Sequence, residues 1–159
     1  MNVPHRTRTA SRLYTPAERA RRDSTPWTVV QGILAPVQFV VFLLSLALVV
    51  RFLLTGDGYV LATASVVAKT SVLLLIMVTG SIWEKAVFGH WLLAPAFFWE
   101  DVVSFGVIAL HLLYVALLMW SGASPQAEMI CALAAYAAYL VNAAQFLRKL
   151  RLARLEVAA

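Results

Sequence analysis

Charged residues are scarce in this sequence, and their scarcity is the first indication of its class. Asp, Glu, Lys and Arg make up only 13% of the 159 residues, while hydrophobic types make up 62%. Soluble domains are about a quarter charged. A water-soluble fold of this size would therefore leave too much apolar surface in water, and the composition predicts a protein embedded in a lipid bilayer.

Cysteine is almost absent, and acidic residues are few. The single thiol, Cys131, has no second cysteine with which to form a disulfide, and we interpret it as a small packing residue. Thirteen Lys and Arg against eight Asp and Glu leave a formal net charge of +5. Basic chain ends can indicate nucleic-acid binding, but no recognised binding module accompanies them, so no nucleic-acid partner is expected.

Four apolar runs are long enough to cross a bilayer, which takes about 20 helical residues. They extend over about residues 27–54, 59–83, 98–120 and 127–147. Most Lys and Arg precede the first run or follow the last, whereas the turns after the first and third runs carry none. Because cytoplasmic segments are enriched in Lys and Arg, the sequence predicts an all-α integral membrane four-helix bundle, N-in and C-in.

A basic N-terminal segment precedes these spans. Residues 1–12 are predicted to be a disordered tail, and residues 13–155 to be a single membrane domain. Thr15 and Glu18 bracket Pro-Ala in a pattern that is typical of a helix start, with Thr15 as the cap and Glu18 as its capping-box partner. A short helix lying at the membrane interface is expected to follow.

Polar side chains inside the spans gather near the predicted cytoplasmic ends. Charged groups in a bilayer are costly unless they are paired or hydrated, so each is a candidate functional residue. Because all four spans offer polar groups at one depth, the pattern predicts a polar cavity there. Alternatively, the amides only join helices by hydrogen bonds, and the acids lie in headgroup water. The residues are Gln31, Gln38, Glu84, Glu100, Asp101, Asn142 and Gln145.

Two further polar residues lie deeper. His111 is eleven residues after Glu100, on nearly the same helix face. It could ligate a metal, relay a proton or bond to a neighbouring helix, and the sequence leaves these alternatives open. Lys69 is expected to pair with another helix or to extend towards the interface, rather than to bind a carboxylate. Tryptophans near the inner face, Trp83 and Trp99 among them, fit either an interfacial belt or a flat aromatic ligand.

Three segments together resemble a known family. They read LYTPAERARRDSTPWTVVQGILAP from Leu13, VTGSIWEKAVFGHWLLAPAFFWEDVVS from Val78 and AAYLVNAAQFLRKLR from Ala137. They are similar to the 3-vinyl bacteriochlorophyllide hydratases, and the resemblance covers nearly all of residues 13–155. It implies a hydro-lyase of bacteriochlorophyll biosynthesis in a bacterial inner membrane, cytoplasmic or intracytoplasmic. Its substrate would be a chlorophyllide-type pigment whose C3 vinyl group becomes 1-hydroxyethyl.

Hydration of an alkene needs a proton donor, a base for the water and support for the cation. Glu100 or Asp101 is expected to be the acid, with Glu84 as partner, because burial can keep a carboxyl group protonated. His111 is a possible axial ligand to the magnesium that the pigment carries, and no protein-bound cofactor is expected. The residues expected to contact the pigment or water are Gln31, Gln38, Trp83, Trp99, His111, Asn142 and Gln145.

Other functions remain open at this stage. A non-catalytic pigment carrier or assembly factor would share the cavity but would not need the carboxylic acid. A small transporter or quinone-binding subunit, or a purely structural subunit, is a further alternative. A transporter should show inverted repeats, and none is visible in the sequence. Because the bundle is small for so large a ligand, a homo-oligomer is also possible.

Overall fold

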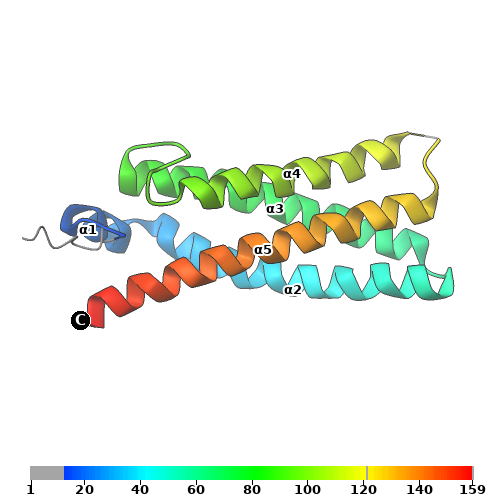
Figure 1. The fold of residues 1–159 in the computed structure, drawn as a ribbon, viewed down its shortest axis with the longest axis horizontal. Helices are drawn as coiled ribbons and strands as arrows, with labels where there is room; N and C mark the ends of the chain where they lie inside the picture. Colours follow the sequence, from blue (N-terminus) through cyan, green and yellow to red (C-terminus); the bar gives the residue numbers. More distant parts are fainter. Residues whose placement is uncertain (1–12, 121, 159) are drawn as a thin grey trace, which may run out of the picture.

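The computed structural model describes residues 13–120 and 122–158. Within this part of the chain there are five helices: α1 (Pro16–Ser24), α2 (Pro26–Thr55), α3 (Tyr59–Phe88), α4 (Phe98–Met119) and α5 (Pro125–Ala158). The last four are long and apolar enough to cross a membrane and run along the long axis of the molecule (Figure 1). The predicted all-α fold with four spans is confirmed. The predicted tail, residues 1–12, lies outside the described residues.

Both described chain ends lie at the same end of the bundle. Helix α1 and the end of α5 are found there with the α3–α4 loop, while the α2–α3 and α4–α5 turns lie at the opposite end (Figure 1). We call the end that holds Arg21, Arg22 and Lys149 the basic end. An even number of spans with both termini on one side agrees with the predicted topology, but its assignment to the cytoplasm stays a prediction from the charges.

Two spans are longer than the sequence indicated. Helix α3 continues past residue 83 to Phe88 and ends at Gly89, whose φ of 83° supplies the left-handed cap. Helix α5 continues past residue 147 to Ala158. The apolar runs end where the bilayer is expected to end, but the segment after 147 is rich in Leu, Ala, Lys and Arg, which are strong helix formers. Helix and span therefore have different boundaries.

Helix α1 begins as predicted and packs against the bundle. The Thr15 side chain accepts a hydrogen bond from the Glu18 amide at 3.3 Å, and the Glu18 carboxylate accepts one from the Thr15 amide at 2.7 Å. The Arg21 side chain then donates to the Val87 carbonyl oxygen at 2.7 Å. Tyr14 is buried, and burial raises the pKa of its phenol. The capping box thus orients a helix that is docked onto the end of α3.

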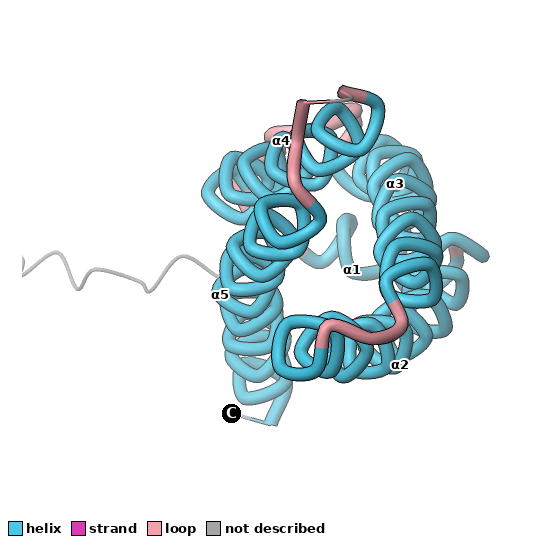
Figure 2. Tube along the Cα trace, turned by 90° about the vertical axis from the view of Figure 1, so that its right-hand side faces the viewer, coloured by secondary structure: helices cyan, strands magenta, loops and turns pink. Residues whose placement is uncertain are grey.

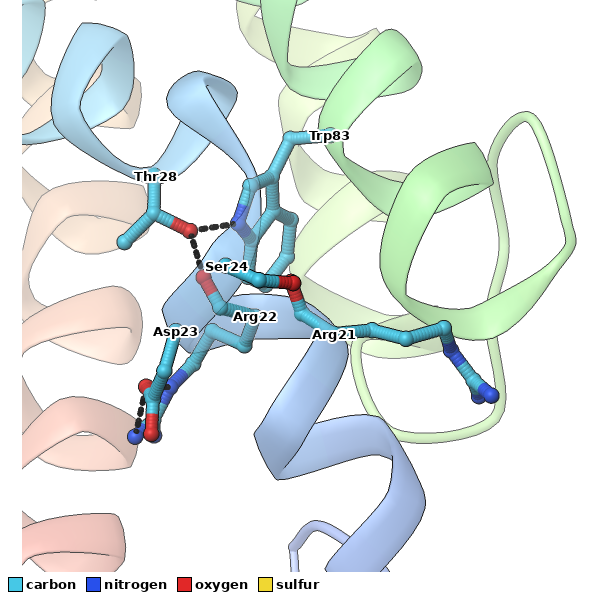
Figure 3. A network of polar contacts seen from close by, with 6 residues as sticks. All are labelled: Arg21, Arg22, Asp23, Ser24, Thr28 and Trp83. Carbon is cyan, nitrogen blue, oxygen red and sulfur yellow. Dashed lines mark hydrogen bonds and ion pairs between the residues drawn. The ribbon is translucent and has the colours of Figure 1, made fainter.

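A polar connection joins α1, α2 and α3 (Figure 3). Thr28 Oγ1 donates to the carbonyl oxygen of Arg22 at 2.6 Å and accepts from Trp83 Nε1 at 2.9 Å. A buried indole N–H usually needs such a partner. The bond fixes the plane of Trp83 at the basic end.

The spans bury polar residues and expose apolar ones. The buried face of α4 consists of Glu100, Asp101, Ser104, Val107, His111 and Tyr114. Its exposed residues include Val102, Phe105, Leu112 and Leu113. Lipid tails are as apolar as these side chains, so the outer face needs no cover, and polar groups gather between the helices. Viewed along the bundle, the four spans surround a common axis (Figure 2).

Candidate functional site

Two of the three predicted acids meet at the basic end. Glu84 from α3 and Asp101 from α4 are 5% and 3% exposed, and their carboxyl groups interact directly. Asp101 Oδ2 accepts a hydrogen bond from the Leu93 amide at 2.7 Å. Glu84 Oε2 accepts one from the Ala94 amide at 3.2 Å. Two consecutive backbone amides therefore hold two carboxyl groups from different helices.

The loop that supplies these amides has an unusual backbone conformation. Leu93 has a φ of 59°, the one positive φ at a non-glycine residue among those described. For a residue with a Cβ atom the left-handed region costs about 1–2 kcal/mol. Such strain persists where surrounding contacts hold the backbone in this conformation, and it is often found at functional sites. Here the amide before the Leu93 Cα atom bonds to Asp101 and the amide after it bonds to Glu84, and these two bonds supply those contacts.

We expect Leu93→Gly to be tolerated and Leu93→Val to destabilise the protein by about 1 kcal/mol, since a β-branched side chain fits the left-handed region worse than leucine does. Leu93 is 41% exposed, so the glycine variant loses little packing. The measurement is the unfolding temperature in detergent. The matched control is Leu92→Val, at a neighbouring position without positive φ. Equal losses from both valine variants would contradict a role for backbone strain.

The third acid, Glu100, is in a different environment from its neighbour Asp101. Its carboxylate forms an ion pair with Lys149 of α5 at 2.5 Å, and the two side chains are 10% and 22% exposed. Adjacent helical residues point about 100° apart. This rotation directs Glu100 to α5 and Asp101 to α3. Next to the pair, Asn142 Nδ2 donates to Ser104 Oγ at 2.8 Å, which donates to the Glu100 carbonyl oxygen.

Aromatic rings form a cluster beside the carboxyl groups. Phe97 lies at its centre, 5.5 Å from the Trp83 ring and 6.0 Å from the Phe146 ring, and the ammonium group of Lys149 is 4.9 Å from its centroid. Tyr14 from the segment before α1 stacks on Phe88 at 5.7 Å. The sequence analysis singled out Trp83 but did not predict that Tyr14, Phe146 and Lys149 join this cluster. These residues are far apart in the chain, so no local sequence pattern indicated that they meet.

Other predicted contact residues lie away from the acids. Trp99 is 69% exposed, on the outer surface of the bundle. Gln31 donates to Thr79 Oγ1 at 2.7 Å and so joins α2 to α3. Gln38 is buried in the bundle, and Gln145 is half-buried on α5. His111 is buried too, about 15 Å from Asp101 along α4. The structure thus divides the predicted site into a group at the basic end and a group in the middle of the bundle.

Lys69 belongs to the middle group. It is fully buried, and its ammonium nitrogen lies 4.0 Å from the centroid of the Tyr139 ring on α5. The expectation that it pairs with another helix is confirmed, and the alternative that it extends towards the interface is wrong. Its place on the inward face of α3 puts the whole side chain among the other spans, with no path to the membrane surface.

The architecture defines a multi-pass helical membrane protein with a buried carboxyl site at one end of its spans. Residues 14–152 match the family described as 2-vinyl bacteriochlorophyllide hydratase. The chain belongs to this family, and the resemblance found in its three segments is confirmed. No solved structure matches the chain.

Two curated relatives bear the same name. The 2-vinyl bacteriochlorophyllide hydratase of Rhodobacter capsulatus is 63% identical over 147 residues, which cover 92% of this chain and 85% of the relative. That of Cereibacter sphaeroides is 61% identical over 157 residues, covering 99% and 94%. Both names describe a hydratase, which is a hydro-lyase. Position 2 in the older tetrapyrrole numbering is position 3 in the current one, so the names agree with the vinyl group expected from the sequence.

Proposed function

We propose that this chain adds water to the C3 vinyl group of a bacteriochlorophyllide-type pigment and that Glu84 and Asp101 handle the proton. Family membership supports the reaction. The observation that carries the site is the buried carboxyl pair held by the Leu93 and Ala94 amides. We further propose that the topology is N-in, C-in, as the basic residues at the chain ends predict, and that the membrane is a bacterial inner membrane. The carboxyl pair then lies near the cytoplasmic face, within reach of an apolar pigment dissolved in the lipid.

The reaction adds the elements of water and changes no oxidation state overall. A proton goes to the terminal vinyl carbon, so that the cation forms on the carbon attached to the macrocycle, which delocalises it. Water attacks that carbon and then loses a proton, which leaves a 1-hydroxyethyl group. The acid is restored by the proton that the water releases. The reaction thus needs one group that can both donate and accept a proton, and no redox cofactor.

The Glu84–Asp101 pair is suited to this role. Two carboxyl groups that share a buried site cannot both ionise cheaply, so together they retain one proton. After donation, the pair carries negative charge beside the cation and can accept the proton from water. Glu100 does not fit the donor role, because its ion pair with Lys149 needs the ionised form. The structure therefore favours Asp101, with Glu84, over Glu100 as the acid.

The aromatic cluster supports a placement for the pigment. Trp83, Phe97 and Phe146 offer apolar ring surface beside the carboxyl pair, which suits a flat macrocycle. We place the pigment's propionate near the basic side chains that follow on α5, Arg148 among them. With the vinyl group at the carboxyl pair, His111 is about 15 Å away along α4, which exceeds the radius of one macrocycle. His111 could therefore ligate the pigment's magnesium only if the pigment were bound in a different position.

The test is an assay on membranes from a host that makes no such pigments, with and without this chain. A 3-vinyl bacteriochlorophyllide is added, and products are followed by absorbance and mass. We expect a blue-shifted product that is heavier by one water. In heavy water, one deuterium should appear in the new methyl group, since the terminal carbon receives the proton. Unchanged pigment that co-purifies with the chain would instead support a carrier.

A further inference from the structure

Several buried polar atoms in the middle of the bundle have no hydrogen-bond partner among the described protein groups. They are Lys69 Nζ, His111 Nε2, the oxygen and nitrogen of the Gln38 amide, and Asn142 Oδ1. Their side chains come from α3, α4, α2 and α5, and none is more than 7% exposed. A buried polar group without a partner destabilises the fold, and a charged one does so more strongly. Four such residues, one from each span, indicate that something bonds to them.

These residues line the same part of the interior. The ammonium group of Lys69 lies over the ring of Tyr139, and the His111 ring is 5.9 Å from the ring of Tyr136. Tyr136, Tyr139 and Asn142 follow one another at three-residue intervals, so they share one face of α5. Gln38 is one turn from Phe42, whose ring is 5.0 Å from that of Tyr139. The unpartnered atoms are thus arranged along the inward face of α5.

The mixture of donors and acceptors identifies the ligand class. The Lys69 ammonium group only donates. His111 Nδ1 bonds to the Val107 carbonyl oxygen at 2.8 Å, and a carbonyl can only accept, so Nδ1 holds the proton and Nε2 accepts. The Gln38 amide does both. A carboxylate or other anion would satisfy Lys69 and leave the acceptors unpaired, while a cation would be repelled by Lys69. Water satisfies donors and acceptors alike, and it typically makes about three such bonds when buried.

We propose that Gln38, Lys69, His111 and Asn142 bind a chain of water molecules inside the bundle, and that this chain supplies the water added to the vinyl group. The second part of this proposal, the supply of water to the vinyl group, rests on the proposed function. Asn142 connects the two regions, since its amide bonds to Ser104, which bonds to the backbone of Glu100 beside the acid site. During the reaction the bound pigment excludes bulk water from Glu84 and Asp101. The water bound inside the bundle then takes the place of water from a direct opening to bulk solvent.

Radical labelling of the pigment-free protein in lipid nanodiscs tests the water site directly. X-ray radiolysis turns bound water into hydroxyl radicals, which modify adjacent side chains that mass spectrometry then locates. Tyr136 and Tyr139 should be modified, although they are only 1% and 8% exposed. Met129 is fully buried, lies about 10 Å along α5 from Tyr136 and is more reactive by nature, so it is the control and should stay unmodified. Protection of both tyrosines at the level of Met129 would overturn the proposal.

Two variants test the link to the reaction. Gln38→Leu and Lys69→Met should each reduce labelling of Tyr139 and lower kcat about tenfold, as expected for one lost hydrogen bond to the reacting water, with pigment affinity unchanged. Thr70→Val is the matched control, because that buried hydroxyl already bonds to the Val66 carbonyl oxygen. Should the labelling fall while kcat stays at the wild-type value, the bound water is not the reacting water. Should wild-type membranes show no hydration at all, the proposed function fails, and labelling alone still decides whether water is bound.

Discussion

Asp101→Asn should abolish hydration while the protein still folds and binds pigment. The amide oxygen can still accept the hydrogen bond from Leu93, so the loop keeps its anchor. What is lost is the ability to hold and transfer a proton, a contribution of about 100- to 10,000-fold for a general acid. Glu84→Gln should have a similar effect, because the pair shares its proton. The measurement is kcat in membranes, together with the dissociation constant for the pigment.

The matched control is Asp57→Asn, the same change in the exposed turn between α2 and α3 at the opposite end of the bundle. It should leave kcat unchanged. An Asp101→Asn enzyme that kept more than about a tenth of the wild-type kcat would remove Asp101 from the proton transfer. Loss of pigment binding in this variant, with kcat unmeasurable for that reason, would reassign Asp101 to substrate binding.

Lys149→Met should destabilise the bundle by about 2 kcal/mol, less than for a fully buried ion pair because the Lys149 side chain is 22% exposed. The change leaves the Glu100 carboxylate largely buried without its counter-ion, and it removes the cation over Phe97. The double variant Glu100→Gln with Lys149→Met should recover most of that loss, because no charge then remains uncompensated. Unfolding in mixed detergent micelles measures both.

Arg151→Met is the control for this second experiment, since it removes a positive charge from an exposed position on the same helix. It should change stability by less than about 0.5 kcal/mol. If the double variant were as unstable as Lys149→Met alone, the lost energy would come from packing of the lysine stem rather than from the unpaired carboxylate.

The spans were predictable because hydropathy is a property of contiguous residues. Each apolar run became a helix near its expected start, and Thr15 with Glu18 formed the capping box that their spacing indicated. The ends of α3 and α5 were not predictable in the same way, because a helix stops at a cap such as Gly89 whereas an apolar run stops where polar residues begin. Three sequence segments were also sufficient to identify the family.

For the site formed by the acidic residues, the sequence predicted only the depth in the membrane at which it lies. Glu84, Glu100 and Asp101 were all expected at one end of the bundle, and they lie there. Which carboxyl faces which partner depends on the rotation of α4, and a difference of about 100° between neighbours sends Glu100 to Lys149 and Asp101 to Glu84. The same lack of rotational information made Trp99, on the outer surface, look equivalent to Trp83.

By itself, the sequence determined that this protein is a four-span membrane bundle of the vinyl hydratase family with acids near one end. Only the tertiary structure decided that the Leu93 and Ala94 amides hold the carboxyl pair and that Lys69 is buried beside Tyr139. The physical reason is the range of the interactions. Hydropathy and capping act between residues close in sequence, whereas pairing between spans depends on how each helix is rotated and tilted against the others.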